Sequence, residues 1–187
     1  MILLALLAAS TAASAPSTRM DFDQKGMIGL SFGFGPAPSL PGSTPNTPPA
    51  SPFAAVVGAT YFIADGTAVR AELGFDGFLS SGSGPATLTL GAGMRMYQLK
   101  RHSVAVFVQP SVVLARYRVI TGGGFDAAEA LTFAGGIGVE YLFTDRFSVG
   151  GVIALGFTIG NIGGPTGSST TTELNTSTSG LFANFYF

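Results

Sequence analysis

The sequence predicts an all-β fold: an eight-stranded antiparallel up-and-down β-barrel. Three observations predict it: a composition that opposes helix, apolar residues at every second position, and connections that alternate between short and long. The 187 residues include 27 Gly and 16 Phe. Glycine destabilises helices, and Phe favours a pleated surface. A chain of this length suits a single domain.

The composition also excludes several classes of protein. Charged residues make up only 10% of the chain and hydrophobic residues 47%, whereas about 25% charged residues is usual. A formal net charge of −1 without a basic cluster argues against nucleic acid as a partner. The absence of Cys excludes disulfides and thiolate chemistry. After Leu7, Gly, Ser, Thr or Pro interrupts every apolar run, which excludes a membrane-spanning helix.

Strand-like alternation begins at Gly26, where Ile28, Leu30 and Phe32 share one face. The eight segments that follow this pattern are 26–35, 53–63, 68–79, 87–97, 103–115, 131–141, 147–159 and 179–187. Each is about 9 to 13 residues long, close to the length that crosses a bilayer at a tilt. The alternation is least clear in 53–63, because Val56 and Phe62 fall on the face that should be small or polar.

The connections between these segments are short and long by turns. The short ones are Asp65-Gly66, a tight hairpin signal, together with 98–102 and 144–146. The long ones are 36–52, 80–86, 118–129 and 161–177. Short turns on one rim and long loops on the other are typical of barrels in bacterial outer membranes, where the short turns are periplasmic.

The charged residues of the strands indicate which face is inside. They lie on the small or polar face, and only Arg116, near a loop, lies on the apolar side. A water-facing exterior would need polar groups on the outside of the strands, so we expect the apolar face to contact lipid. The charged residues assigned to the lumen are Arg70, Glu72, Asp76, Arg95 and Glu140. The alternative is a soluble barrel or sandwich, in which the apolar faces would converge on a common core.

Lipid on the outside requires the sheet to close, because unpaired backbone groups in hydrocarbon cost several kcal/mol each. We therefore expect 179–187 to pair with 26–35, which explains why the chain ends on an aromatic strand. Aromatic residues should form girdles at both interfaces. The expected periplasmic set is Tyr61, Tyr141, Phe147, Phe185 and Phe187, and the opposite set is Phe34, Phe53, Phe75, Phe133 and Phe157.

Residues 1–15, "MILLALLAASTAASA", consist of a short apolar run followed by small residues. This pattern is typical of an export signal, cleaved near Ala13 or Ala15. A buried N-terminal helix is the alternative.

The export-like start, the eight alternating segments and the final strand ending in Phe187 resemble the small, eight-stranded bacterial outer-membrane β-barrels. This group contains the transmembrane domain of outer membrane protein A and outer membrane protein X. The resemblance implies a signal peptide (1–15), a periplasmic N-terminal segment (16–25) and a barrel (26–187). It also implies a monomer in the bacterial outer membrane, in contact with its lipids and lipopolysaccharide. In this family the barrel-assembly machinery recognises the last strand, here through Leu181, Ala183, Phe185, Tyr186 and Phe187.

An eight-stranded barrel is just wide enough inside for side chains to fill it. We expect the five lumen charges to form a paired polar network, with Glu72 and Arg95 in contact. A gated ion path through these residues is the alternative. The many inward Gly residues leave less bulk than a tight plug, which keeps open a narrow path for water or a small apolar ligand.

Nothing in the sequence indicates a catalytic, cofactor or metal site. The only His, His102, lies in a short turn, on the rim opposite to where a lipid-modifying barrel enzyme would need it. The expected function is therefore that of a non-enzymatic barrel with a structural or surface-interaction role through its extracellular loops. The alternative is a porin-like channel or transporter for small solutes or hydrophobic molecules.

Overall fold

A computed structural model describes residues 23–35, 54–76, 86–121, 124–164 and 167–187. These residues form eight strands: β1 (Ile28–Gly35), β2 (Ala54–Ala64), β3 (Thr67–Asp76), β4 (Ala86–Arg101), β5 (Val104–Thr121), β6 (Gly124–Thr144), β7 (Phe147–Gly164) and β8 (Gly167–Tyr186). The described part of the chain has no helix that is long and apolar enough to cross a membrane.

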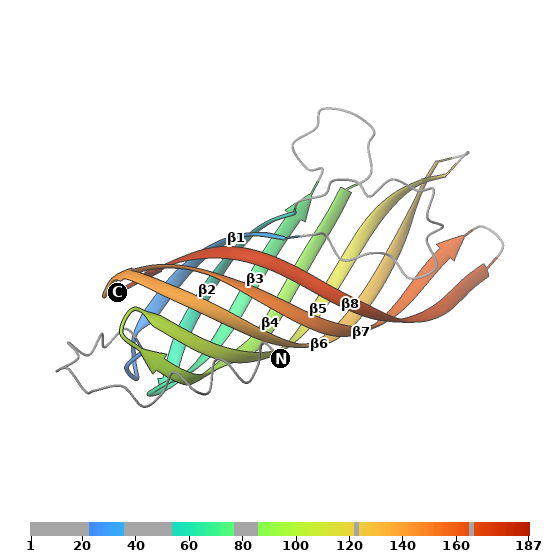
Figure 1. Ribbon diagram of the computed structural model, residues 1–187. Coiled ribbons are helices and arrows are strands. Elements are labelled where there is room, and N and C mark those ends of the chain that lie inside the picture. The colour runs from blue at the N-terminus through green and yellow to red at the C-terminus, as the bar shows by residue number, and fades with distance from the viewer. Residues whose placement is uncertain (1–22, 36–53, 77–85, 122–123, 165–166) are drawn as a thin grey trace.

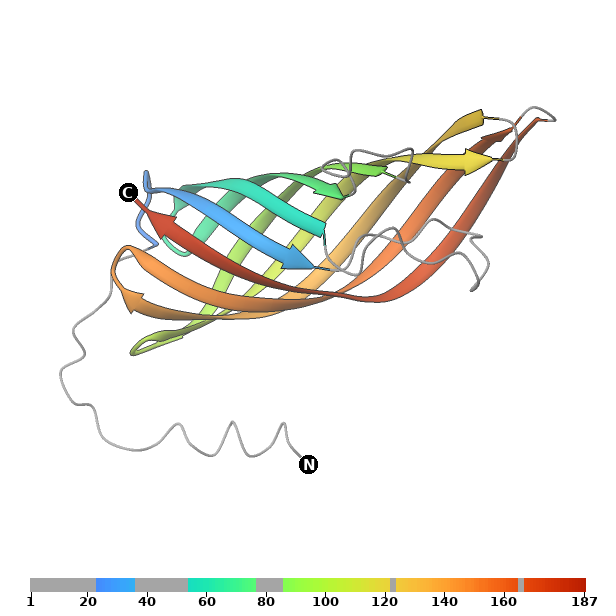
Figure 2. The same ribbon diagram turned by 90° about the horizontal axis from the view of Figure 1, so that it is seen from above.

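The strands form one closed antiparallel barrel in sequence order (Figures 1 and 2). β8 closes the sheet by pairing with β1, from Gly29 opposite Tyr186 to Phe34 opposite Leu181. The Phe187 amide extends this ladder by donating to the Ile28 carbonyl at 2.8 Å. The predicted fold class is confirmed, and the aromatic C-terminus is part of the closing strand.

The strands are tilted, as barrel closure requires. Following paired residues from strand to strand shows the tilt: Phe185 of β8 pairs with Leu30 of β1. Seven further pairings return to β8 at Leu174, which pairs with Phe157 of β7. One circuit of the barrel therefore climbs along β8 from Phe185 to Leu174.

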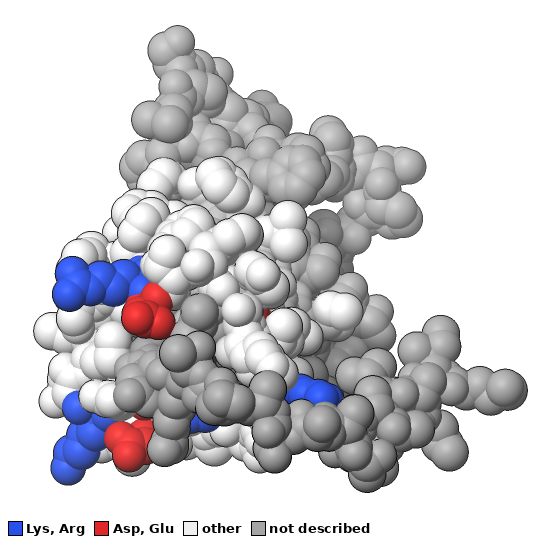
Figure 3. Space-filling model, turned by 60° about the vertical axis from the view of Figure 1, so that its left-hand side comes forward, with Lys and Arg blue, Asp and Glu red and all other residues white. Residues whose placement is uncertain are grey.

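Apolar side chains cover the outside of the barrel. Ile137, Ile153 and Leu155 are each at least 60% exposed, whereas Arg70 and Glu140 are buried on the inner face. Figure 3 shows a face on which the described Lys, Arg, Asp and Glu form a few patches and most of the other described surface is uncharged. The apolar faces therefore do not converge on a common core, and the exterior is suited to lipid rather than to water.

Aromatic rings form a continuous row on the outside near the C-terminus. Tyr141, Phe143, Phe147 and Phe185 follow one another with centroid distances of 5.0, 5.7 and 4.9 Å, and Phe32 lies 6.4 Å beyond Phe185. The row contains Tyr141, Phe147 and Phe185 of the expected girdle, and Phe143 and Phe32 are unforeseen members.

At the other end of the apolar surface Phe34, Phe133 and Phe157 point outward and are exposed, and Phe75 is half-buried. Phe53 lies outside the described residues, as do 1–15, the Pro-rich 36–52 and nearly all of 80–86.

The predicted strand lengths are wrong for the second half of the barrel. β5 to β8 contain 18, 21, 18 and 20 residues, and most of 118–129 and 161–177, expected as loops, continues these strands. Figure 2 shows the β5–β6 and β7–β8 hairpins extending beyond the ends of β1 to β4. Thr favours strands, and beyond the hydrocarbon a strand needs no apolar face, so the alternation that marks a spanning strand disappears there.

We predict that Ile137→Arg destabilises the barrel in a phospholipid bilayer by about 2 to 4 kcal/mol, because it places a cation on the lipid face. The conservative Ile137→Leu is the control and should cost much less. Because the chain has no Trp, the folded fraction is best read from gel mobility with and without boiling, over a urea series. Equal stability of the two variants would contradict a lipid-facing exterior.

Candidate functional site in the lumen

The Glu140 carboxylate lies at the centre of a buried polar cluster inside the barrel. One oxygen accepts from Arg95 Nη1 at 3.2 Å and from the Tyr97 hydroxyl at 2.7 Å. The other accepts from the Ser148 hydroxyl, from Asn184 Nδ2 at 2.9 Å and from the Tyr186 hydroxyl at 2.5 Å. The donors come from β4, β7 and β8, so the cluster connects three strands to β6 across the lumen.

Arg95 is held between two aromatic rings. Its guanidinium carbon lies 4.0 Å from the centroid of Phe107 and 4.4 Å from that of Phe182. The Arg95 side chain is 1% exposed and that of Glu140 0%. Cation–π contacts and the paired carboxylate together compensate for the removal of this cation from water. They also account for Arg95 Nη2, which has no hydrogen-bond partner among the described residues.

A second ion pair lies beside the first. Arg70 pairs with Glu72 of its own strand and donates to the Ser31 hydroxyl at 3.2 Å. Gln109 connects the two pairs, because its side-chain oxygen accepts from Arg70 Nη1 at 3.2 Å and from Arg95 Nε at 3.1 Å. The Glu72 side chain is 29% exposed, so this second pair is less completely buried than the first.

Five aromatic rings surround these charges and fill the lumen near the short turns. They are Phe62, Tyr97, Phe107, Phe182 and Tyr186. We call these five rings together with the Arg95–Glu140 ion pair the lumen plug. Successive rings contact one another, from Tyr186 to Phe62 at 6.0 Å and from Tyr97 to Phe107 at 5.7 Å between centroids. None of the five is more than 9% exposed, so little solvent reaches this level of the barrel.

Inward glycines provide the room for these rings. A Cβ at Gly138 would overlap the Phe107 ring, and one at Gly150 would overlap the Phe182 ring. At Gly29 it would lie 2.9 Å from the ring of Tyr186. The expectation that inward glycines leave the lumen under-filled is therefore wrong at these positions, because a ring from a neighbouring strand occupies the space.

The structure brings four of the five predicted lumen residues into this region. Arg95 and Glu140 are in the plug, and Arg70 and Glu72 form the adjacent pair. The side chain of Asp76 lies outside what the structure describes. The predicted contact between Glu72 and Arg95 is wrong: the register sets Ala68, not Glu72, opposite Arg95, which leaves Arg95 nearer the short turns.

Sequence reasoning missed the aromatic part of the plug. The signal was present, because Phe62 and Phe107 fall on the face that otherwise carries small and polar residues. An aromatic residue on that face marks a filled lumen in a barrel of this width. A glycine that makes room for such a ring lies on an adjacent strand, as Gly138 does for Phe107. These ring–glycine pairs can therefore be identified only once the register of the strands is known.

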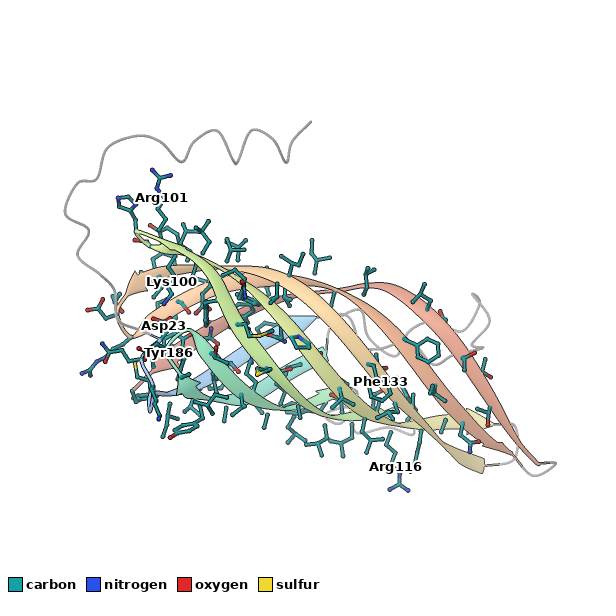
Figure 4. All side chains as sticks on the ribbon, turned by 90° about the horizontal axis from the view of Figure 1, so that it is seen from below. Asp23, Lys100, Arg101, Arg116, Phe133 and Tyr186 are labelled. Atoms are coloured by element: carbon teal, nitrogen blue, oxygen red, sulfur yellow. The ribbon has the colours of Figure 1, made fainter. Side chains whose placement is uncertain are left out.

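Residues 23–27 fold back over the end of the barrel, and we call them the N-terminal strap. The Asp23 carboxylate pairs with Lys100, and its carbonyl accepts from the Gly66 amide at 3.0 Å. Met27 packs against the plug. Figure 4 labels Asp23 and Lys100 near Tyr186, at the same end of the barrel. The strap therefore covers the plug on the side of the short turns.

The remaining predicted residues lie on the surface or on both faces of β8. Leu181 and Phe187 point outward and are at least 70% exposed, whereas Tyr186 points inward into the plug. His102 is exposed in the turn between β4 and β5. Among the described residues no cluster of His, Asp and Glu is arranged to hold a metal ion.

Three solved structures are similar to this chain over most of its length. The N-terminal β-barrel domain of OprF from Pseudomonas aeruginosa has a TM-score of 0.56 and 12% identity, covering 87% of this chain and 98% of that one. Neisserial surface protein A (NspA) has a TM-score of 0.55 and 15% identity, covering 86% and 96%. The outer membrane protein OprG from Pseudomonas aeruginosa has a TM-score of 0.55 and 11% identity, covering 88% and 97%. Comparisons with protein families and with curated proteins find no match.

The closed eight-stranded sheet, the apolar exterior and these structural similarities define the class: the chain has the fold of the small bacterial outer-membrane β-barrels. Within this fold the lumen is filled near the short turns by the Arg95–Glu140 pair and the surrounding rings.

We predict that Gly138→Ala destabilises the barrel by about 1 to 3 kcal/mol, because the added methyl overpacks the plug. Its Cβ would overlap the Phe107 ring and lie 2.7 Å from the Gly151 carbonyl oxygen. Gly135→Ala on the same strand is the matched control, since nothing lies within 4 Å of a Cβ there. The midpoint of urea unfolding in vesicles measures both, and equal midpoints would show that the ring does not need this glycine.

Proposed function

We propose that the protein is a non-enzymatic integral outer-membrane barrel that acts through its extracellular side, in a structural or surface-interaction role. The lumen plug is the observation that carries this proposal. The interior of this barrel is occupied by aromatic rings and a buried ion pair. Such a barrel is suited to anchoring its extracellular hairpins in the membrane rather than to conducting solutes.

The shape of the molecule supports an outward-directed role. The hairpins β5–β6 and β7–β8 extend beyond β1 to β4 at the end opposite the C-terminus (Figure 1). Short turns and both ends of the described chain lie at the other rim, which is periplasmic in barrels of this class. The long hairpins therefore present their tips to the outside of the cell.

The position of His102 supports a non-enzymatic role. It lies at the periplasmic rim, far along β4 and β5 from the projecting hairpins. A lipid-modifying site at the outer rim would need its base at the opposite end of these strands, because a general base must lie within hydrogen-bond reach of the group that it activates.

We also propose that 1–15 act as the signal peptide, that 16–25 precede the barrel in the periplasm, and that the barrel is a monomer. The assembly machinery would recognise the outward face of the last strand, formed by Leu181, Ala183, Phe185 and Phe187. Tyr186 contributes instead to the lumen through its hydrogen bond to Glu140.

A porin-like channel or transporter is the second candidate, and the partial exposure of Glu72 favours it. The Glu72 side chain is 29% exposed although it lies on the inner face. The lumen is therefore less tightly filled on the side of the plug that is farther from the short turns. Passage of a solute would still require the Arg95–Glu140 pair and the rings around it to move.

The plug predicts that the wild-type protein gives no single-channel steps in a planar bilayer. Phe107→Ala should give small conductance steps, because it removes a fully buried ring from the plug. Phe133→Ala is the matched control: it removes the same ring from the lipid face, where Phe133 is 51% exposed, and should remain silent. Steady conductance of the wild type would favour the channel instead.

The proposed orientation predicts which single thiol is accessible on intact cells. Because the chain has no Cys, Ser168→Cys near the tip of the β7–β8 hairpin and Asp145→Cys in the β6–β7 turn each carry one thiol. A membrane-impermeant maleimide should label the first on intact cells and the second only after the outer membrane is permeabilised. The reverse pattern would contradict an outward-facing hairpin.

A further inference from the structure

The apolar surface of the barrel ends abruptly on β5, β6 and β7. On β5 every outward residue from Val104 to Leu114 is apolar, and the next outward residue is Arg116. In the same direction along the barrel, the outward residue beyond Leu131 on β6 is Glu129, and the outward residue beyond Ile159 on β7 is Asn161. A tilted strand crosses the hydrocarbon in about 9 to 11 residues, which is the span from Val104 to Leu114.

These polar residues are neighbours in the sheet. Arg116 pairs with Glu129, Glu129 with Asn161, and Asn161 with Thr170 of β8. All four are exposed on the outer face, and we call them the boundary row. The row supplies a guanidinium, a carboxylate, an amide and a hydroxyl directly above the lipid-facing surface.

The guanidinium of Arg116 has spare hydrogen-bonding capacity. Its Nε lies 3.8 Å from Glu129 Oε1, and the two side chains are 68% and 62% exposed. This distance is too long for a hydrogen bond, and exposed ion pairs contribute little to stability. Within the described residues the two Nη groups of Arg116 have no partner, so up to four N–H donors are available to a ligand.

The surroundings of Arg116 indicate what this ligand is. Leu88 and Leu114, its register and strand neighbours, are 41% and 49% exposed and belong to the apolar surface. Figure 4 shows Arg116 pointing away from the barrel wall. An acyl chain lying against Leu88 and Leu114 would place its headgroup at the guanidinium, and Arg binds phosphate with a favourable two-point geometry.

We propose that the boundary row is a binding site for the phosphate of an outer-leaflet lipid, with Arg116 as the phosphate ligand. Asn161 and Thr170 offer hydrogen bonds to hydroxyl or amide groups of the same headgroup. Glu129 competes with the phosphate for the guanidinium. The proposal rests on the membrane location and outward orientation of the hairpins, and it adds a partner and a residue to that function.

The test is native mass spectrometry of the full-length refolded protein in a non-ionic detergent, titrated with dilauroyl phosphatidic acid. Dilauroylglycerol, which has the same chains without phosphate, measures the contribution of the apolar surface alone. Inorganic phosphate measures binding of the free anion. Arg116→Gln and Glu129→Gln are the test variants, and Arg146→Gln, an exposed cation at the other rim, is the matched control.

We expect the wild type to prefer phosphatidic acid over dilauroylglycerol. Arg116→Gln should weaken phosphatidic acid binding about tenfold, the loss of one charge-assisted hydrogen bond. Glu129→Gln should strengthen it about threefold by removing a competing anion. Arg146→Gln should bind like the wild type, and salt should weaken only the phosphate-dependent part.

Three results would overturn the proposal: no preference for the phosphate lipid, wild-type binding by Arg116→Gln, or weaker binding by Glu129→Gln. Inorganic phosphate binding as tightly as the lipid would assign the row to a free anion instead. Gel mobility of the same samples, with and without boiling, shows whether each variant is folded. Conductance and thiol labelling test the proposed function separately, so either can fail without the other.

Discussion

The apolar exterior of the barrel is suited to lipid, which would leave each polar group of the strands with no water on its outer side. The backbone groups are satisfied by the ladder, which closes where β8 pairs with β1 and where Phe187 bonds to Ile28. Polar side chains must turn inward, and there they need partners because isolated buried charges are costly. Closure of the sheet and pairing inside the lumen thus follow from the same solvent.

Among the described residues of the lumen, Glu140 accepts the most side-chain hydrogen bonds. It accepts from its neighbour β7 and also from β4 and β8, which are not neighbours of β6 in the sheet and are joined to it across the interior. The rings around it rest on glycines of adjacent strands, as Phe107 does on Gly138. Because Asn184 and Tyr186 belong to the closing strand, the polar cluster is complete only when the barrel is closed.

The two ends of the barrel differ for physical reasons. At the end that carries the short turns, the strap covers the plug and an aromatic row lies on the outside of the barrel. At the opposite end β5 to β8 continue past the apolar surface, where either face of a strand can be solvated. The boundary row lies at this transition. A cation on the lipid-facing side of a barrel costs about 2 to 4 kcal/mol at the bilayer midplane and only about 0 to 1 kcal/mol near the interface.

The sequence by itself determined the solvent, the strand period and the closure. A strand with one face toward lipid places apolar residues at every second position, so Leu88, Leu90 and Ala92 alternate with the smaller or polar Thr89 and Gly91, and this alternation is local. It also assigned Arg70, Arg95 and Glu140 to the inside. It failed for the projecting hairpins, because strands with water on both faces carry no such alternation.

Only the tertiary structure decided which inward residues meet. Arg95 and Glu140 lie on β4 and β6, with β5 between them, and Glu140 bonds to Tyr186 of β8. Such contacts cross the lumen, so they depend on the tilt and stagger of the whole closed sheet. No segment of the chain encodes that stagger alone, because it is set jointly by the register of all eight strand pairs.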